Sequence, residues 1–274
     1  MTIDTPIRED HTLAATHRAV WASGDYALMA EEVMAPLGPI LVTATSITPG
    51  RRVLDVAAGS GNISLPAARA GGIVVSTDLT PELLQRSRIR AAEQGLRLHW
   101  RQANAHALPF DDDEFDIVMS AIGVMFAPDQ QCAADQLVRV CRPGGTIGVI
   151  SWTPTGFFGR MLATIRPYRP GLSAAVPPAA LWGREEYAVG LLGDRVTTVS
   201  AHRDMLRVNR FDRAEDVHHY FKNHYGPTIE AFANIGENSV LAAALDAQLI
   251  ELAQEFLIEG VMDWEYLLLT AKKR

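Results

Sequence analysis

The chain has 274 residues, of which 48% are hydrophobic and 21% charged, and this composition predicts a folded protein with a sizeable core. Its 25 basic and 32 acidic residues give a net charge of −7, which disfavours nucleic acid as a partner and favours a small molecule or another protein. Two cysteines, an N-terminus unlike a secretory signal and the absence of a long apolar run predict a cytoplasmic protein with no disulfide framework and no membrane span.

The chain divides into three stretches by pattern. Residues 1–50 contain a helical pattern over 11–45 and predict an N-terminal helical cap. Residues 51–152 alternate strand-like and helical segments, which is typical of βαβ units. We expect strands at 53–56, 73–77, about 96–100, 115–119 and 146–152, and helices at about 62–72, 80–95 and 129–142.

The third stretch, residues 153–274, is rich in proline and glycine at first and mostly helical over 214–260. Strand-like pieces at 205–208 and 266–270 interrupt it. We interpret it as a helical lid with the last two strands of the same sheet. The prediction is therefore one integrated α/β domain: a doubly wound, mostly parallel, seven-stranded sheet with N-terminal helices and a helical lid insertion.

The turn after the first strand, "DVAAGSGN" over residues 55–62, fits a dinucleotide motif poorly. Counted from Gly59, the third glycine of G-x-G-x-x-G would be Ser64, and counted from Ala57 the first glycine is missing. The carboxylate of Asp55 would repel a pyrophosphate and attract an ammonium group. The pattern favours a ligand without phosphate.

Polar residues also end the next two strands. Asp78, nineteen residues after Gly59, can accept hydrogen bonds from both hydroxyls of a ribose, and Asn104 with Ala105 can frame an adenine. S-adenosylmethionine carries an ammonium group, a ribose and an adenine and has no phosphate. Three strand ends thus match three parts of one cofactor.

Residues 51–152 resemble the class I, Rossmann-like S-adenosylmethionine-dependent methyltransferases, closest to the type 11 branch that includes the quinone-biosynthesis methyltransferases. The segments that carry the resemblance are "VLDVAAGSGN", "VVSTDLTPELL", "ANAHALPFDDDEFDIVMSAIGVMF" and "LVRVCRPGGTIGVISW". The resemblance implies that Gly59 and Gly61 pass close to the methionine moiety, that Asp78 binds the ribose, and that Ser120 lies near the cofactor. The candidate cofactor residues are Asp55, Ala57, Gly59, Ser60, Gly61, Asp78, Leu79, Asn104, Ala105, Ser120 and Tyr26.

Two positions depart from the family pattern. Ala57 replaces the usual first glycine, which is tolerable if its backbone is not left-handed. Asn104 stands where aspartate is commoner, and its carbonyl oxygen could still accept from the adenine amino group.

Several side chains have two interpretations. Tyr26 closes over the cofactor or packs the N-terminal helices, and Trp152 points toward the substrate or belongs to the core. His224 or Tyr225 contacts substrate, or both belong to an amphipathic lid helix. His106 is a possible general base or an ordinary loop histidine, whereas Cys132 and Cys141, placed on one helix, are expected to pack in the core.

No metal site is predicted, because His218, His219 and His224 do not converge on one helical face. The function we predict is methyl transfer from S-adenosylmethionine to a small-molecule acceptor by in-line displacement, with S-adenosylhomocysteine as product. An NAD(P)-dependent oxidoreductase and a non-catalytic S-adenosylmethionine-binding protein are the alternatives. The residues leave open the acceptor, the atom methylated, the use of a base and the oligomeric state.

Overall fold

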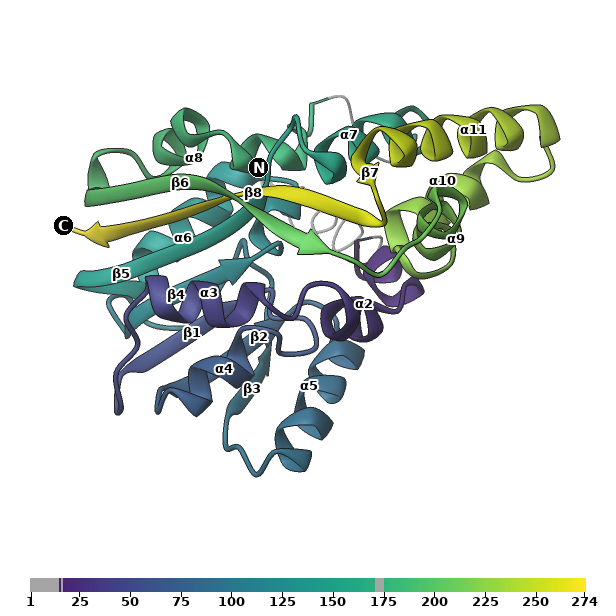
Figure 1. Ribbon diagram of the computed structural model, residues 1–274. Coiled ribbons are helices and arrows are strands. Elements are labelled where there is room, and N and C mark those ends of the chain that lie inside the picture. The colour runs from purple at the N-terminus through teal and green to yellow at the C-terminus, as the bar shows by residue number, and fades with distance from the viewer. Residues whose placement is uncertain (1–14, 16, 171–174) are drawn as a thin grey trace, which may run out of the picture.

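A single twisted sheet runs through the computed structural model, which describes residues 15, 17–170 and 175–274 (Figure 1). The strand order is β3-β2-β1-β4-β5-β8-β6, and β7 pairs with β8 off this path. The strands are β1 (Arg52–Val56), β2 (Ile73–Asp78), β3 (His99–Gln102), β4 (Phe115–Ala121), β5 (Cys141–Trp152), β6 (Val196–Val208), β7 (Leu257–Ile258) and β8 (Val261–Lys273).

The sheet is parallel from β3 to β5 and antiparallel at β8 and β6. This confirms the doubly wound, mostly parallel α/β fold. The predicted number of seven strands is wrong, because β7 is an eighth strand. It forms a tight hairpin with β8 through Glu259 and Gly260, both of which have positive φ, and two residues are too short to leave a pattern in the sequence.

Helices cover the two faces and one end of the sheet (Figure 1). The α-helices are α2 (Tyr26–Glu32), α3 (Leu37–Ala44), α4 (Ser64–Arg69), α5 (Pro81–Glu93), α6 (Gln130–Val140), α7 (Phe157–Ile165), α8 (Glu185–Leu192), α9 (Ala214–His224), α10 (Gly226–Ile235) and α11 (Ser239–Phe256), and the 3-10 helices are η1 (Val124–Phe126), η2 (Arg166–Tyr168), η3 (Ala179–Gly183) and η4 (Gly193–Arg195). Residues 17–23 are also helical, whereas 1–14 and 16, which belong to the predicted cap, lie outside the described residues.

The boundaries of β3, β5, β6 and β8 differ from the prediction, and β3 covers His99–Gln102 in place of about 96–100. Strand β5 begins at Cys141, so this cysteine lies opposite Phe115 in the sheet and not on the helix with Cys132; the helix α6 ends at Val140. Strands β6 and β8 are 13 residues each, much longer than predicted. Most of β6 is exposed, because it is the edge strand, so polar residues hide its length in the sequence.

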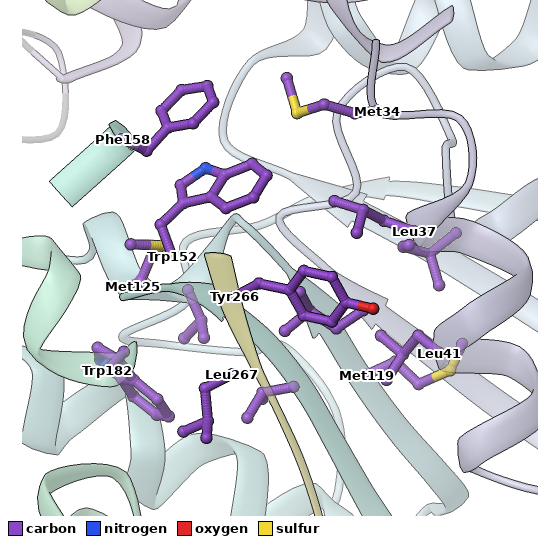
Figure 2. Close-up of a cluster of buried hydrophobic side chains, with 14 of the residues drawn as sticks. Met34, Leu37, Leu41, Met119, Met125, Trp152, Phe158, Trp182, Tyr266 and Leu267 are labelled. Atoms are coloured by element: carbon purple, nitrogen blue, oxygen red, sulfur yellow. The ribbon is translucent and has the colours of Figure 1, made fainter. Parts of the chain in front are cut away.

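Large buried side chains gather around β5 and β8. Figure 2 shows Trp152 and Tyr266 of these strands with Phe158 of α7, Trp182 of η3, and Leu37 and Leu41 of α3. Trp152, at the end of β5, is fully buried, stacks on Phe158 with ring centroids 4.4 Å apart and meets the edge of Trp264 at 6.1 Å. Of its two interpretations, Trp152 therefore takes the core one. Among the described residues no single helix is long and apolar enough to cross a membrane; only α2 and α3 taken together, bent by 75°, pass that test of length and composition.

Candidate cofactor site

The turn after β1 is held in an unusual backbone conformation. Ala57, Gly59 and Gly61 all have positive φ, at +55°, +55° and +90°. A Cβ added to Gly59 would meet no atom within 4 Å, whereas one added to Gly61 would lie 2.5 Å from Ser87 Oγ. Gly59 thus faces open space and Gly61 faces packed protein. The expectation that the backbone of Ala57 is not left-handed is wrong, and the residue is therefore strained.

The turn after β4 packs closely against Ala57. A Cβ on Gly123 would lie 2.7 Å from both the Cβ and the carbonyl oxygen of Ala57, so only glycine fits there. The residue before it, Ile122, has φ +53°, which is rare for a β-branched side chain. Both strained residues, Ala57 and Ile122, line the same cavity. Strain of this kind concentrates at functional sites.

Asp55 lies beneath the turn and does not line the cavity. It is fully buried; its Oδ2 accepts a hydrogen bond from Ser64 Oγ at 2.6 Å, and its Oδ1 has no partner among the described residues. Burial raises the pKa of Asp55 to about 7, and the neighbouring charge of Asp78 adds to this, against the opposing effect of the Ser64 hydrogen bond. A direct contact between Asp55 and an ammonium group would need the turn to move.

Asp78 lies on the cavity wall and is 7% exposed. Its Oδ1 accepts from the Thr80 N–H at 2.8 Å and its Oδ2 from the Gly59 N–H at 2.9 Å, so the carboxylate is fixed against the glycine turn. Burial raises its pKa, against the effect of these hydrogen bonds. Each oxygen keeps a lone pair that a ribose hydroxyl can use.

Sequence-predicted residues separate into two groups. The cavity is lined by Tyr26, Ala57, Gly59, Ser60, Asp78, Leu79, Asn104, Ala105 and Tyr225, whereas Asp55, Gly61, Ser120, Trp152 and His224 do not line it. The hydroxyl of Ser120 donates to the Val56 carbonyl at 2.8 Å and accepts from the Val124 N–H at 2.9 Å, which joins the turns after β1 and β4.

The polar groups of three lining residues are partly engaged. The side-chain oxygen of Asn104 accepts from the His106 N–H at 3.0 Å, which leaves its amide hydrogens for a ligand. The Nε2 atom of His106 accepts from the Asp129 N–H at 3.3 Å. The Tyr26 hydroxyl accepts from the Gly226 N–H at 3.1 Å, so Tyr26 both lines the cavity and packs, and burial raises its pKa well above the usual value.

Other wall residues were missed by sequence reasoning. His17, Trp21, Phe126 and Phe158 line the cavity together with Tyr225. They come from the N-terminal segment, η1 and α7. Phe126 ends one of the segments that carry the family resemblance but was not singled out there, and no local motif marks the other three. The pattern of aromatic residues in the first 26 positions was the only available signal, and it was used for Tyr26 alone.

The wall suits a cationic nucleoside better than a phosphate. In the part of the chain that the structure describes, no lysine or arginine lines the cavity, whereas the Asp78 carboxylate does. A pyrophosphate would therefore find no cationic side chain there. The chemistry of these residues fits S-adenosylmethionine, for which the open space over Gly59 would hold the methionine moiety, Asp78 the ribose and Asn104 the adenine.

The described residues contain no group of three or more His, Cys, Asp or Glu side chains that could hold a metal ion. His218 instead contacts Asp246, with its Nε2 2.8 Å from Oδ1, and Lys222 donates to the same oxygen at 2.6 Å. His224 packs its ring against Tyr220.

Comparisons with known proteins agree with this geometry. Residues 53–145 match the methyltransferase domain family. An uncharacterized protein of Mycobacterium tuberculosis is 75% identical over 274 residues, which cover 100% of both chains. A demethylmenaquinone methyltransferase of Clavibacter sepedonicus is 36% identical over 115 residues, 41% of this chain and 46% of that protein. The crystal structure of a putative methyltransferase from Bacillus halodurans has the same fold, with a TM-score of 0.57 and 19% identity over 85% of this chain and 97% of that one.

Proposed function

Because the chain belongs to the class I S-adenosylmethionine-dependent methyltransferases, we propose that it methylates a small molecule held at the aromatic end of the cavity. One observation carries the proposal: a single cavity is lined both by Gly59, Asp78 and Asn104 and by the rings of Trp21, Phe126 and Tyr225. A cofactor end and an apolar end within one cavity are what methyl transfer to a bound small molecule requires.

The residues of the cofactor end bind and orient. The glycine turn and Asp78 are rigidly joined by the Gly59 hydrogen bond, and Asn104 is fixed by His106, so their positions are set before a ligand arrives. S-adenosylmethionine, when bound, supplies an electrophilic methyl group on a sulfonium. Its transfer is an in-line displacement, whose rate depends on alignment of the acceptor atom with that methyl.

The residues of the aromatic end exclude water and hold an apolar acceptor. We define the acceptor chamber as His17, Trp21, Phe126, Phe158 and Tyr225. The rings of Trp21 and Phe126 meet edge to face with centroids 4.6 Å apart, and Tyr26 and Tyr225 meet at 5.9 Å. Such a wall favours an acceptor of aromatic size with few charges.

Calorimetry followed by turnover tests the proposal. We expect S-adenosylhomocysteine to bind and NADH to show no heat, and we expect S-adenosylhomocysteine to be released from S-adenosylmethionine when small aromatic acceptors are added. Binding of NADH with no binding of S-adenosylhomocysteine would support an oxidoreductase. Tight cofactor binding with no turnover over a broad acceptor panel would support a non-catalytic binding protein.

A further inference from the structure

The acceptor chamber and the wall next to it carry few ionisable groups, and most are already engaged. Asp78 accepts two backbone N–H groups and Tyr26 accepts one. The Nε2 atom of His106 accepts the Asp129 N–H, which places its ring proton on Nδ1 and removes it as a proton acceptor. Burial raises the pKa of Tyr225, which keeps its hydroxyl protonated.

His17 is the exception. It lines the chamber and is half-buried, and neither ring nitrogen makes a hydrogen bond in the part of the chain that the structure describes. A neutral imidazole has one lone pair that can take a proton. His17 is therefore the basic group of the wall that a ligand can reach without breaking an existing hydrogen bond.

Charges around His17 favour the neutral ring. Burial is the largest effect and lowers the pKa of His17, and the guanidinium of Arg169 lowers it further. The carboxylate of Glu230 raises this pKa, and His106 lowers it. Arg169 and Glu230 form an ion pair with side chains only 12% and 21% exposed, so both are held near the chamber. The imidazole is consequently in its proton-accepting form at neutral pH.

We propose that His17 accepts the proton of the methyl acceptor, and that this acceptor is a weakly acidic hydroxyl, a phenol or an enol, on an apolar frame. The inference rests on the proposed function and specifies its substrate class. The hydroxyl oxygen forms the bond to the methyl carbon, the bond from that carbon to sulfur breaks with its electron pair left on sulfur, and the hydroxyl proton passes to His17. The imidazolium then returns the proton to water.

Other acceptor classes match the chamber less well. A carboxylate is already ionised, and a neutral amine already has its lone pair, so neither needs a base before attack. An ammonium ion would have to enter beside a sulfonium and near Arg169, with repulsion from both. A hydroxyl is the acceptor for which a neutral imidazole in an apolar wall increases the rate.

A matched pair of probes tests the assignment without turnover. 4-Nitrophenol and 4-nitroaniline have almost the same shape and differ in a hydroxyl or an amine. On the protein loaded with S-adenosylhomocysteine, followed by calorimetry and tryptophan fluorescence, we expect the phenol to bind more tightly. His17→Asn should weaken phenol binding about tenfold, the worth of one hydrogen bond, and weaken aniline binding less, because an aromatic N–H is a poorer donor than a phenol O–H. His224→Asn, outside the cavity, is the control and should change neither.

Turnover with a phenol adds a readout that a purely structural role would not change. The rate should fall at acidic pH with an apparent pKa below 6.5, and His17→Asn should remove this dependence and lower kcat by about 10²–10⁴. Equal binding of the two probes, no binding of either, or a His17→Asn variant with wild-type phenol affinity and pH profile would overturn the assignment. The binding results are read with S-adenosylhomocysteine bound, and the pH profile is read in turnover with S-adenosylmethionine. Failure of the protein to bind S-adenosylhomocysteine is the separate result that refutes the proposed function.

Discussion

Replacing Ala57 by glycine is expected to stabilise the protein. Ala57 has φ +55°, a left-handed conformation that costs an L-residue about 1–2 kcal/mol and costs glycine almost nothing. Glycine loses more conformational freedom on folding than alanine does, which offsets about 0.5–1 kcal/mol of this gain in stability. The methyl group removed lies against Gly123, so little other packing is lost. The net expectation is a gain of about 0.5–1 kcal/mol in the free energy of unfolding.

Urea denaturation of Ala57→Gly and of Ala58→Gly measures this directly. Ala58 is the adjacent buried alanine and has no positive φ, so its replacement by glycine should cost about 0.5–1 kcal/mol without any relief of strain. Calorimetry should give both the wild type and Ala57→Gly nearly the same affinity for S-adenosylhomocysteine. If Ala57→Gly lowers the unfolding free energy as much as Ala58→Gly does, the argument from backbone strain is refuted.

Three further predictions follow from the same site. Gly59→Val should abolish binding of S-adenosylhomocysteine in calorimetry while the circular dichroism spectrum remains that of a folded protein. A β-branched residue at φ +55° is strained, and its side chain enters the open space. Retained affinity would mean that the ligand lies elsewhere. Gly123→Ala should lower the melting temperature, and less so in the Ala57→Gly background, because the Ala57 methyl group is one of the three atoms that the new Cβ would approach closely. Equal losses in both backgrounds would exclude that contact. The pKa of Asp55 is raised from 3.8 to about 7, so the folded state binds a proton that the unfolded state has lost, and the ligand-free protein should lose stability as pH rises from about 4 to about 7. Asp55→Asn should flatten the dependence of the urea midpoint on pH. An unchanged slope would contradict the assignment to Asp55.

Much of the cofactor end can be predicted from the sequence, because parallel strands end at one edge of a sheet. Asp78 and Asn104 end β2 and the segment after β3, and both reach the cavity. The same reasoning misplaces Asp55 and Ser120, which also lie at strand ends. Their side chains form hydrogen bonds with Ser64 and with the backbone of Val56 and Val124 instead. Whether a polar side chain faces a ligand or a neighbouring loop depends on the position of that loop, which local sequence does not contain.

Apart from Tyr225, the acceptor chamber could not be predicted, because its wall joins segments that are far apart in the chain. The Tyr26 hydroxyl accepts from the N–H of Gly226, 200 positions away, and the Asp25 N–H donates to the His224 carbonyl at 2.9 Å. Glycines make this approach possible: a Cβ on Gly24 would lie 2.5 Å from the His224 carbonyl oxygen.

The close contact between the N-terminal segment and the start of α10 also bears on which acceptor the protein would bind. Tyr26 accepts a hydrogen bond from Gly226 at the start of α10, and a Cβ on Gly226 would lie 2.2 Å from the carbonyl oxygen of Val20, so the segment that carries His17 and Trp21 lies directly against this helix start. Glu230, on the same α10, sets part of the charge around His17. If the acceptor chamber binds the acceptor as proposed, a substitution in α10 is expected to change both the shape of the chamber and the basicity of His17. Specificity would then depend jointly on the N-terminal segment and α10, neither of which carries a recognisable motif.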